Sequence, residues 1–232
     1  MNEESHTSFK KLLKLLSLEV LLVSVVFIVS LFAFAFIADG VVTGNEKAFD
    51  GKVFSFFSYY STPGFIQAMK ISTFLGSAEF LIPAYVILIT LFIRKKLYKY
   101  AINITIIAVS STALLFILKN IFHRQRPSLP IIRTITTYSF PSGHMLSSFV
   151  FCSILCFIVI KSSWKLFYKW ITSILLFLFA ITIGVSRVVL KAHYPTDVVA
   201  SLFLGIAWVI LSFYILRKMN RKYSISNKNM SV

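Results

Sequence analysis

Two of the four histidines stand beside residues that could support phosphoryl transfer. His193 and Asp197 are four residues apart, the spacing at which two side chains lie on one face of a helix. A carboxylate that binds one imidazole nitrogen fixes the tautomer and leaves the other nitrogen free to attack. His144, at the start of a long apolar run, could then protonate the departing oxygen. These three residues predict nucleophilic catalysis by a histidine.

Cationic residues near the ends of apolar runs predict a site for an anion. Lys119 and Arg126 are seven residues apart, so two helical turns would align them, although Pro127 disfavours helical geometry at Arg126. Arg187 lies at the end of a later apolar run. A guanidinium group binds phosphate oxygens in bidentate fashion, and a lysine adds a point charge. A cation in the bilayer centre costs about 2.5–3.5 kcal/mol, so cations in or beside span ends need a reason. Snorkelling to the interface would explain scattered single residues, but it explains less easily a group of five at the outer ends of two spans.

The stretch Pro141–His144 reads Pro-Ser-Gly-His and precedes an apolar run. We expect Ser142 to be the N-cap of a helix, and Gly143 would let a ligand come close to the backbone. The free N–H groups at a helix start favour an anion, and the helix dipole assists them. This stretch therefore predicts a helix terminus that binds phosphate.

Metal chemistry has no clear support in the sequence. No cluster of acidic residues is placed to hold Mg²⁺ or Zn²⁺, so we expect no metal and no cofactor, with the cations stabilising the transition state instead. Cys152 and Cys156 are four residues apart in an apolar run and lack the spacing of a metal site. We interpret both as small apolar residues of a helix.

Three short motifs together resemble the signature of the type 2 phosphatidic acid phosphatases, the PAP2 or lipid phosphate phosphatase superfamily. Lys119–Pro127 matches K-x₆-R-P, residues 141–144 match P-S-G-H, and Ser186–Asp197 matches S-R-x₅-H-x₃-D. The order and the internal spacings agree with the family pattern over residues 119–197. The resemblance implies a helical core shared with vanadium haloperoxidases and bacterial acid phosphatases.

The resemblance also implies a role for each matching residue. His193 would form a phosphohistidine, Asp197 would orient it, and His144 would act as the general acid and later activate water. The phosphate would be held by Lys119, Arg126, Ser142, Gly143 and Arg187. Outside the signature we expect at most a supporting role for His123, Arg124 and Lys191, none for His6, and a possible head-group contact for Arg133 and Tyr138.

The composition excludes an ordinary soluble domain. Of the 232 residues 57% are hydrophobic, and the mean hydropathy is +0.82. The net charge is +16, but the charges separate apolar blocks, so we expect a membrane and an anionic ligand as partners and no nucleic acid. Runs long enough to cross a bilayer are 17–37, 71–93, 100–118, 145–160 (with a start near Gly143), 171–190 and 198–216. We therefore predict an all-α membrane protein with six spans in a single domain, 1–232.

The basic residues predict the orientation. Most of the 24 lysines and arginines flank the two termini and the loops after the second and fourth runs, which places both termini in the cytoplasm and the site at the outer face of the cell membrane. The first run could instead be a signal peptide, since Lys10, Lys11 and Lys14 precede it and residues 33–35 read Ala-Phe-Ala. Its length favours a retained helix.

Aromatic residues crowd the segment between the first two spans. Phe49–Tyr60 holds six aromatic side chains and is followed by Pro63-Gly64, which predicts a helix lying in the outer interface. Such a helix is either a plain anchor or a wall beside a lipid entrance. The acids in and around this region, Asp39, Glu46, Asp50 and Glu79, include no pair spaced for catalysis.

We expect a bacterial membrane enzyme that hydrolyses a phosphomonoester or pyrophosphate of a lipid. Phosphatidylglycerol phosphate, phosphatidic acid and undecaprenyl pyrophosphate all fit, because the motifs contact only the phosphate. A phosphotransferase with an alcohol acceptor in place of water is the main alternative. An anion transporter is disfavoured because the cations lie at span ends, and a scaffold without catalysis is disfavoured by the intact histidine–aspartate pair. The sequence does not specify the oligomeric state.

Overall fold

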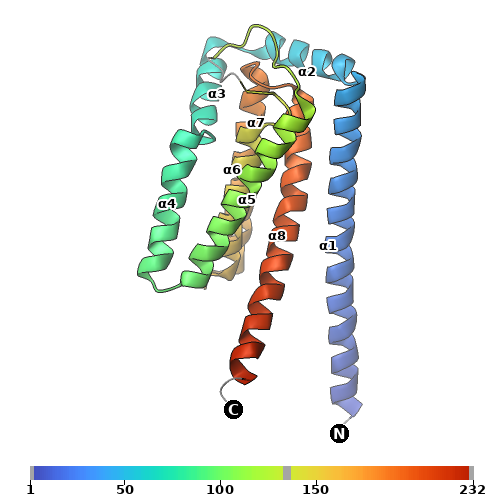
Figure 1. Cartoon of the computed structure of the whole chain (residues 1–232), viewed down its shortest axis with the longest axis vertical. Coiled ribbons are helices and arrows are strands. Elements are labelled where there is room, and N and C mark those ends of the chain that lie inside the picture. Colours follow the sequence, from blue (N-terminus) through green and yellow to red (C-terminus); the bar gives the residue numbers. More distant parts are fainter. Residues whose placement is uncertain (1–2, 133–136, 230–232) are drawn as a thin grey trace.

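The described part of the chain, residues 3–132 and 137–229 of a computed structural model, is helical and contains no strand. The all-α prediction is therefore confirmed for these residues. The helices are α1 Glu3–Thr43, α2 Lys47–Tyr60, α3 Pro63–Leu75, α4 Ala78–Arg94, α5 Tyr98–Phe122, α6 Gly143–Lys161, α7 Leu166–Val189 and α8 Pro195–Asn229 (Figure 1).

Five helical segments in this part of the chain are long and apolar enough to cross a membrane, and α3 and α4 together would make a sixth span. The span predicted at residues 71–93 is not a single straight helix. The helix begins earlier, at Pro63, and α3 and α4 are bent by 43° at a break between Leu75 and Ala78. The other predicted spans lie inside helices that extend further at one or both ends, except that the run at 171–190 ends one residue past α7.

Close packing explains the break at Gly76. A Cβ atom on this residue would lie 2.8 Å from the hydroxyl of Ser148 on α6 and would also overlap Ile183 on α7. The chain therefore changes direction where only glycine fits against two other helices. The same point is 3.5 Å from Cδ2 of His144, so the break lies beside a predicted catalytic residue.

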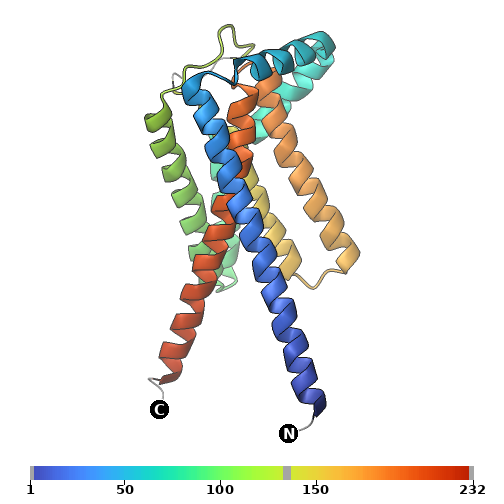
Figure 2. The same cartoon turned by 90° about the vertical axis from the view of Figure 1, so that its right-hand side faces the viewer.

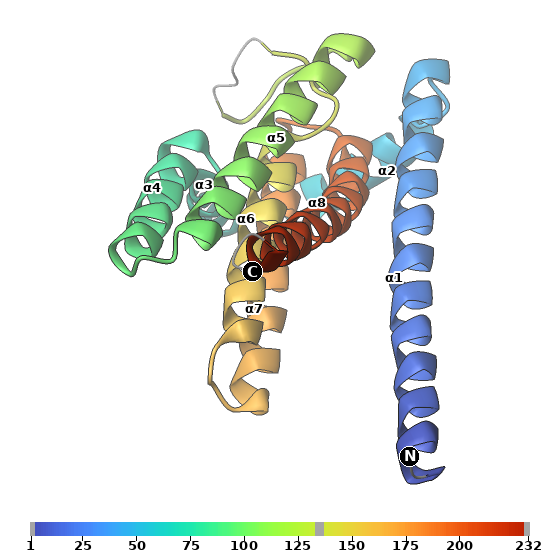
Figure 3. The same ribbon diagram turned by 60° about the horizontal axis from the view of Figure 1, so that its bottom comes forward.

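Helix α6 lies inside the bundle and packs against α5, α7 and α8 (Figure 3). Its buried side chains Leu146, Val150 and Ile154 share an apolar core with Ile107 of α5 and Leu204 of α8. Helix α1 crosses α8 at the edge of the bundle (Figure 2), and most of its large apolar side chains from residue 18 on, where burial is described, are exposed. Apolar surface of this extent is typical of helices that contact lipid.

Helix α2 lies across one end of the bundle, the end opposite to the two termini (Figure 1). Its aromatic side chains Phe56, Tyr59 and Tyr60 are exposed. The loop between α5 and α6 and the short α7–α8 connection lie at this same end (Figure 1). The fold therefore gathers the three signature motifs, which are far apart in the sequence, beside α2.

Candidate functional site

His193 and Asp197 form a buried pair at the α7–α8 connection. Nδ1 of His193 is 3.3 Å from Oδ2 of Asp197, and the two side chains are 2% and 0% exposed. The pair forms because α8 begins at Pro195, so that Asp197 lies in its first turn and turns back towards the preceding loop. Nε2 of His193 faces away from the carboxylate, 3.3 Å from the guanidinium of Arg126. The Nε2 edge of the imidazole is thus on the side of Arg126.

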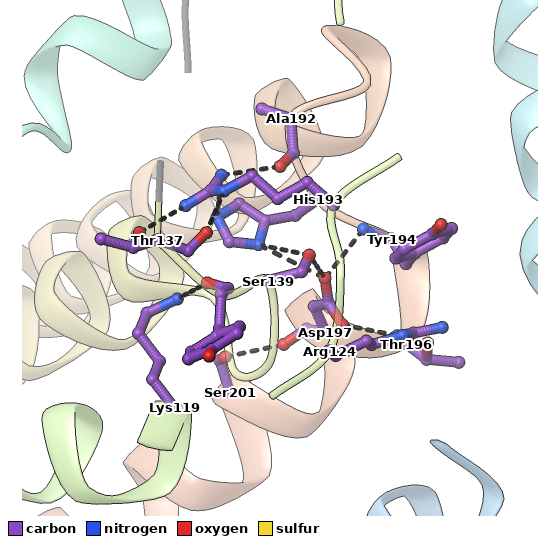
Figure 4. Close-up of polar contacts among 12 residues, drawn as sticks. Lys119, Arg124, Thr137, Ser139, Ala192, His193, Tyr194, Thr196, Asp197 and Ser201 are labelled. Carbon is purple, nitrogen blue, oxygen red and sulfur yellow. Dashed lines mark hydrogen bonds and ion pairs between the residues drawn. The ribbon is translucent and has the colours of Figure 1, made fainter. Parts of the chain in front are cut away.

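Three further donors hold the carboxylate of Asp197 (Figure 4). The Ser139 hydroxyl and the Tyr194 N–H donate to Oδ2, the latter at 3.0 Å, and Arg124 donates to Oδ1 at 2.5 Å. Sequence reasoning missed Ser139 because nothing in its position indicates a contact with a residue 58 positions later. It also underestimated Arg124, whose only signal was its place between two signature cations.

The chain leaves the helix before Arg126, four residues earlier than the position that Pro127 predicts, so helical turns do not align Lys119 with Arg126. Helix α5 ends at Phe122, and His123 adopts a left-handed conformation with φ 48°, which turns the chain out of the helix. Arg126 is instead held by the loop: Nε donates to the Thr137 carbonyl at 2.8 Å and one terminal nitrogen donates to the Ala192 carbonyl at 2.9 Å.

The remaining cations lie around the same point. Lys119 donates to the Tyr138 carbonyl (Figure 4). Arg187 is 5% exposed and donates to the Thr73 hydroxyl of α3 at 2.6 Å. His144, at the start of α6, is within electrostatic reach of Lys119, Arg126, Arg187 and His193. The three signature motifs therefore converge on one positively charged region.

Ser142 occupies the N-cap position of α6, as predicted, but its hydroxyl does not cap the helix. The side chain is fully buried, and its Oγ has no hydrogen-bond partner among the described residues. Its backbone N–H donates to the carbonyl of Asp197 at 3.3 Å, which fixes the helix start beside the carboxylate. Nε of Arg187 is likewise buried without a partner. Unpaired buried donors are costly, so these two atoms indicate a place for an acceptor-rich ligand such as phosphate.

Burial and charge set the protonation of the groups outside the helices. Burial lowers the pKa of His193 to about 4, although Asp197 opposes the change, so the imidazole is neutral at pH 7 and its Nε2 can accept the hydrogen bond from Arg126. Burial also lowers the pKa of Arg126. For Arg124 burial acts in the same direction, but the carboxylates of Asp197 and Asp50 outweigh it and raise the pKa.

Other residues considered in the sequence lie at the margin. His123 contacts the ring of Tyr138 edge-on, with the centroids 4.5 Å apart, and Lys191 is partly exposed. Arg133 and the side chain of His6 lie outside the described residues. Among the described side chains, no group of three or more His, Cys, Asp or Glu residues is arranged to hold a metal ion.

The arrangement defines a helical membrane protein with a buried, cationic region beside a neutral histidine. The family model of the PAP2 superfamily matches residues 98–221, more than half of the chain. The chain belongs to the PAP2 superfamily, as its three motifs predicted.

Individual relatives agree with this assignment. Phosphatidylglycerophosphatase B of Bacillus subtilis (strain 168) is 26% identical over 197 residues, which cover 84% of this chain and 95% of the relative. The crystal structure of a transmembrane PAP2-type phosphatidylglycerolphosphate phosphatase from Bacillus subtilis has a TM-score of 0.74 at 23% identity, over 84% of this chain and 96% of that one. The crystal structure of Aquifex aeolicus LpxE has a TM-score of 0.55 at 26% identity, and the match covers 70% of this chain and 93% of that one.

Proposed function

We propose that this protein is a membrane lipid phosphatase that works through a phosphohistidine on His193. The observation that carries the proposal is the buried His193–Asp197 pair with the Arg126 guanidinium at Nε2 of the histidine. Two buried donors of the other motifs support it, because Ser142 Oγ and Arg187 Nε have no partner among the described residues. A phosphoryl group placed there would satisfy both donors and would lie on the Nε2 side of the imidazole. We also propose that residues 1–232 form one domain.

The first step forms a bond between Nε2 of His193 and phosphorus while the bond from phosphorus to the leaving oxygen breaks. His144 gives its proton to that oxygen, so the lipid alcohol departs neutral. Asp197 holds Nδ1–H and stabilises the positive charge that develops on the ring. Lys119, Arg126, Arg187 and the N–H groups at the start of α6 stabilise the charge on the equatorial oxygens.

The second step is the hydrolysis of the phosphohistidine. His144, now neutral, takes a proton from a water molecule whose oxygen attacks phosphorus as the P–N bond breaks. Inorganic phosphate leaves, and His193 regains its lone pair. Both steps conserve atoms and charge with side chains of this chain alone, so we propose that catalysis requires no metal ion.

Phosphatidylglycerol phosphate is our first choice among the lipid substrates. Support comes from the similarity to phosphatidylglycerophosphatase B along nearly the whole length of that relative. We propose further that both termini are cytoplasmic and that the site faces the outer leaflet. The distribution of lysine and arginine supports this orientation, because the α4–α5 and α6–α7 connections at the other end of the bundle are rich in them.

A panel of lipids tests this function directly. Purified protein in detergent is expected to release phosphate from phosphatidylglycerol phosphate faster than from phosphatidic acid or undecaprenyl pyrophosphate, and none from the phosphodiester phosphatidylglycerol. EDTA should leave most of the activity in place. Release from none of the three substrates would refute the phosphatase, and appearance of the phosphate on an added alcohol would identify a transferase. Complete loss in EDTA that Mg²⁺ reverses would refute the metal-free mechanism.

A further inference from the structure

A buried arginine joins the carboxylate of Asp197 to the helix that lies across the end of the bundle. One terminal nitrogen of Arg124 donates to Asp197 at 2.5 Å and to the Thr196 hydroxyl at 2.8 Å. The other terminal nitrogen donates to Glu46 and Asp50, both at 2.8 Å. The sequence placed these two acids outside catalysis, yet they contact the cation that contacts Asp197.

Asp50 also binds the first turn of α8 directly. Its carboxylate accepts the Thr196 N–H at 3.0 Å and the Thr196 hydroxyl at 2.9 Å, and it is 2% exposed. The guanidinium of Arg124 lies over the ring of Tyr194, 4.0 Å from its centroid. The helix α2 is thus fixed to the segment that carries the catalytic pair by buried, charged hydrogen bonds, which are stronger than neutral ones.

We propose that Arg124 is a positioning residue that sets the orientation and the effective charge of Asp197, and that Glu46 and Asp50 adjust Arg124 in turn. The proposal rests on the proposed function, because it gives these residues an effect on the reactivity of His193. It makes α2 a part of the catalytic unit in addition to any contact with the membrane.

The charges around His193 predict the direction in which each substitution shifts its pKa. The charged or titratable groups facing His193 are Asp197 from α8, Arg126 from the α5–α6 loop, Arg187 from α7 and His144 from α6. Arg124 lies on the far side of Asp197 and partly cancels its charge. Removal of Arg124 would strengthen the negative field at His193 and raise its pKa, whereas removal of the Asp50 charge would leave Arg124 less neutralised and lower it.

The test compares Arg124→Gln and Asp50→Asn with Lys52→Gln, an exposed residue of the same helix. The pH profile of kcat/KM reports the pKa values of the essential groups of the free enzyme. The substrate also titrates, but its pKa is the same for all variants, so a difference between variants comes from the protein. The acid limb is expected to move to higher pH in Arg124→Gln, to lower pH in Asp50→Asn and not at all in Lys52→Gln. In Arg124→Gln kcat should fall about 10- to 100-fold with KM little changed, the size expected when the charged hydrogen bond to Asp197 is lost.

Arg124→Lys provides a second variant that keeps the charge but loses the forked geometry. It is expected to keep the acid limb in place and to lose part of kcat, even if Arg124→Gln does not fold. If the role were purely structural, Arg124→Gln and Asp50→Asn would both lower the thermal stability without shifting the acid limb of the pH profile in opposite directions. That result would overturn the proposal. Inactivity of the unsubstituted protein would instead refute the phosphatase function.

A separate cavity lies at the end of the bundle opposite to this site. It has a volume of about 700 Å³ and is lined mainly by α5, α6 and α8. Its apolar lining includes Ile104, Ile154 and Leu216, which are 5%, 2% and 6% exposed. The rings of Phe157 and Phe213 are stacked beside them, with centroids 4.8 Å apart.

The rim of this cavity is cationic. Lys99, Lys161 and Arg217 line it together with one acid, Glu19. None of the three cations takes part in an ion pair with a described side chain. The rim therefore carries unneutralised positive charge directly above an apolar space, the combination that binds anionic lipid head groups between membrane helices.

We infer that an anionic phospholipid of the leaflet opposite to the active site occupies this cavity. Its phosphodiester would lie among the three cations, and part of an acyl chain would fill the apolar space between α5, α6 and α8. The apolar lining favours a lipid over free phosphate, and the charge of the rim favours an anionic lipid over a zwitterionic one.

Native mass spectrometry and thermal shift can test this site. Phosphatidylglycerol is expected to bind and to raise the melting temperature of the full chain, whereas phosphatidylcholine and inorganic phosphate should do neither. The variant Lys99→Gln/Lys161→Gln/Arg217→Gln should lose the response, and a variant with the matched exposed changes Lys52→Gln/Lys70→Gln/Lys95→Gln should keep it. Equal stabilisation by phosphatidylcholine or by inorganic phosphate, or an undiminished response in the first variant, would overturn the inference.

Discussion

Replacing His193 with alanine is expected to lower phosphate release by about 10⁴-fold or more, as the loss of a covalent nucleophile does in other enzymes. The reason is that no P–N bond can form, while the cations still bind the substrate. The first measurement is release of phosphate from detergent-dispersed lipid. The second is labelling of the protein by a lipid substrate whose phosphomonoester is radioactive, followed by a test of whether acid or base removes the label. A phosphohistidine is stable to base and labile to acid, and the variant should carry no such label.

The control for this experiment is Lys191→Gln, a change in the same loop at a partly exposed residue that contacts neither Asp197 nor Arg126 among the described hydrogen bonds. It should keep most of the activity. Circular dichroism and the melting temperature would establish that His193→Ala remains folded in detergent. Full turnover by a folded His193→Ala protein would show that another residue is the nucleophile.

His144→Ala is expected to slow the phosphorylation step by about 10²- to 10⁴-fold when the leaving group is a lipid alcohol, the usual contribution of a general acid. An alkoxide is a poor leaving group and needs the proton. A nitrophenolate leaves without one, so with nitrophenyl phosphate the same step should lose much less. Single-turnover measurement of phosphoenzyme formation separates this step from hydrolysis, which should be slow with both substrates because His144 also activates water.

His123→Ala is the matched histidine control, because this residue contacts the ring of Tyr138 at the margin of the site. Its activity should remain close to that of the unsubstituted protein with both leaving groups. An equal loss of phosphorylation rate for the alkyl and the nitrophenyl substrate in His144→Ala would contradict the general-acid role and would indicate that His144 only helps to bind phosphate.

The membrane architecture follows from local properties of the chain. A run of about 20 apolar residues must form its backbone hydrogen bonds internally in a bilayer, so each such run specifies a helix wherever it occurs. The predicted runs at 100–118, 145–160 and 198–216 lie wholly inside α5, α6 and α8, and the run at 171–190 ends one residue past α7. The first predicted span likewise lies inside α1.

The signature motifs were also readable from the sequence, because each consists of a few residues at fixed spacing. They predict roles for His193, Asp197 and His144 and a set of residues that would bind phosphate. The structure brings these residues together at one end of the bundle, and their catalytic roles remain predictions that the two histidine variants will test.

The supporting contacts were decided by the tertiary structure alone. Arg124 meets Glu46 across 78 positions of the chain and Asp197 across 73, and no local pattern encodes such a pairing. The break at Gly76 depends on side chains of α6 and α7 that approach only in the folded bundle. Ser142 has the residue type and the position of an N-cap, yet its hydroxyl is left without a partner, because the packing around the start of α6 determines which acceptor or donor it can reach.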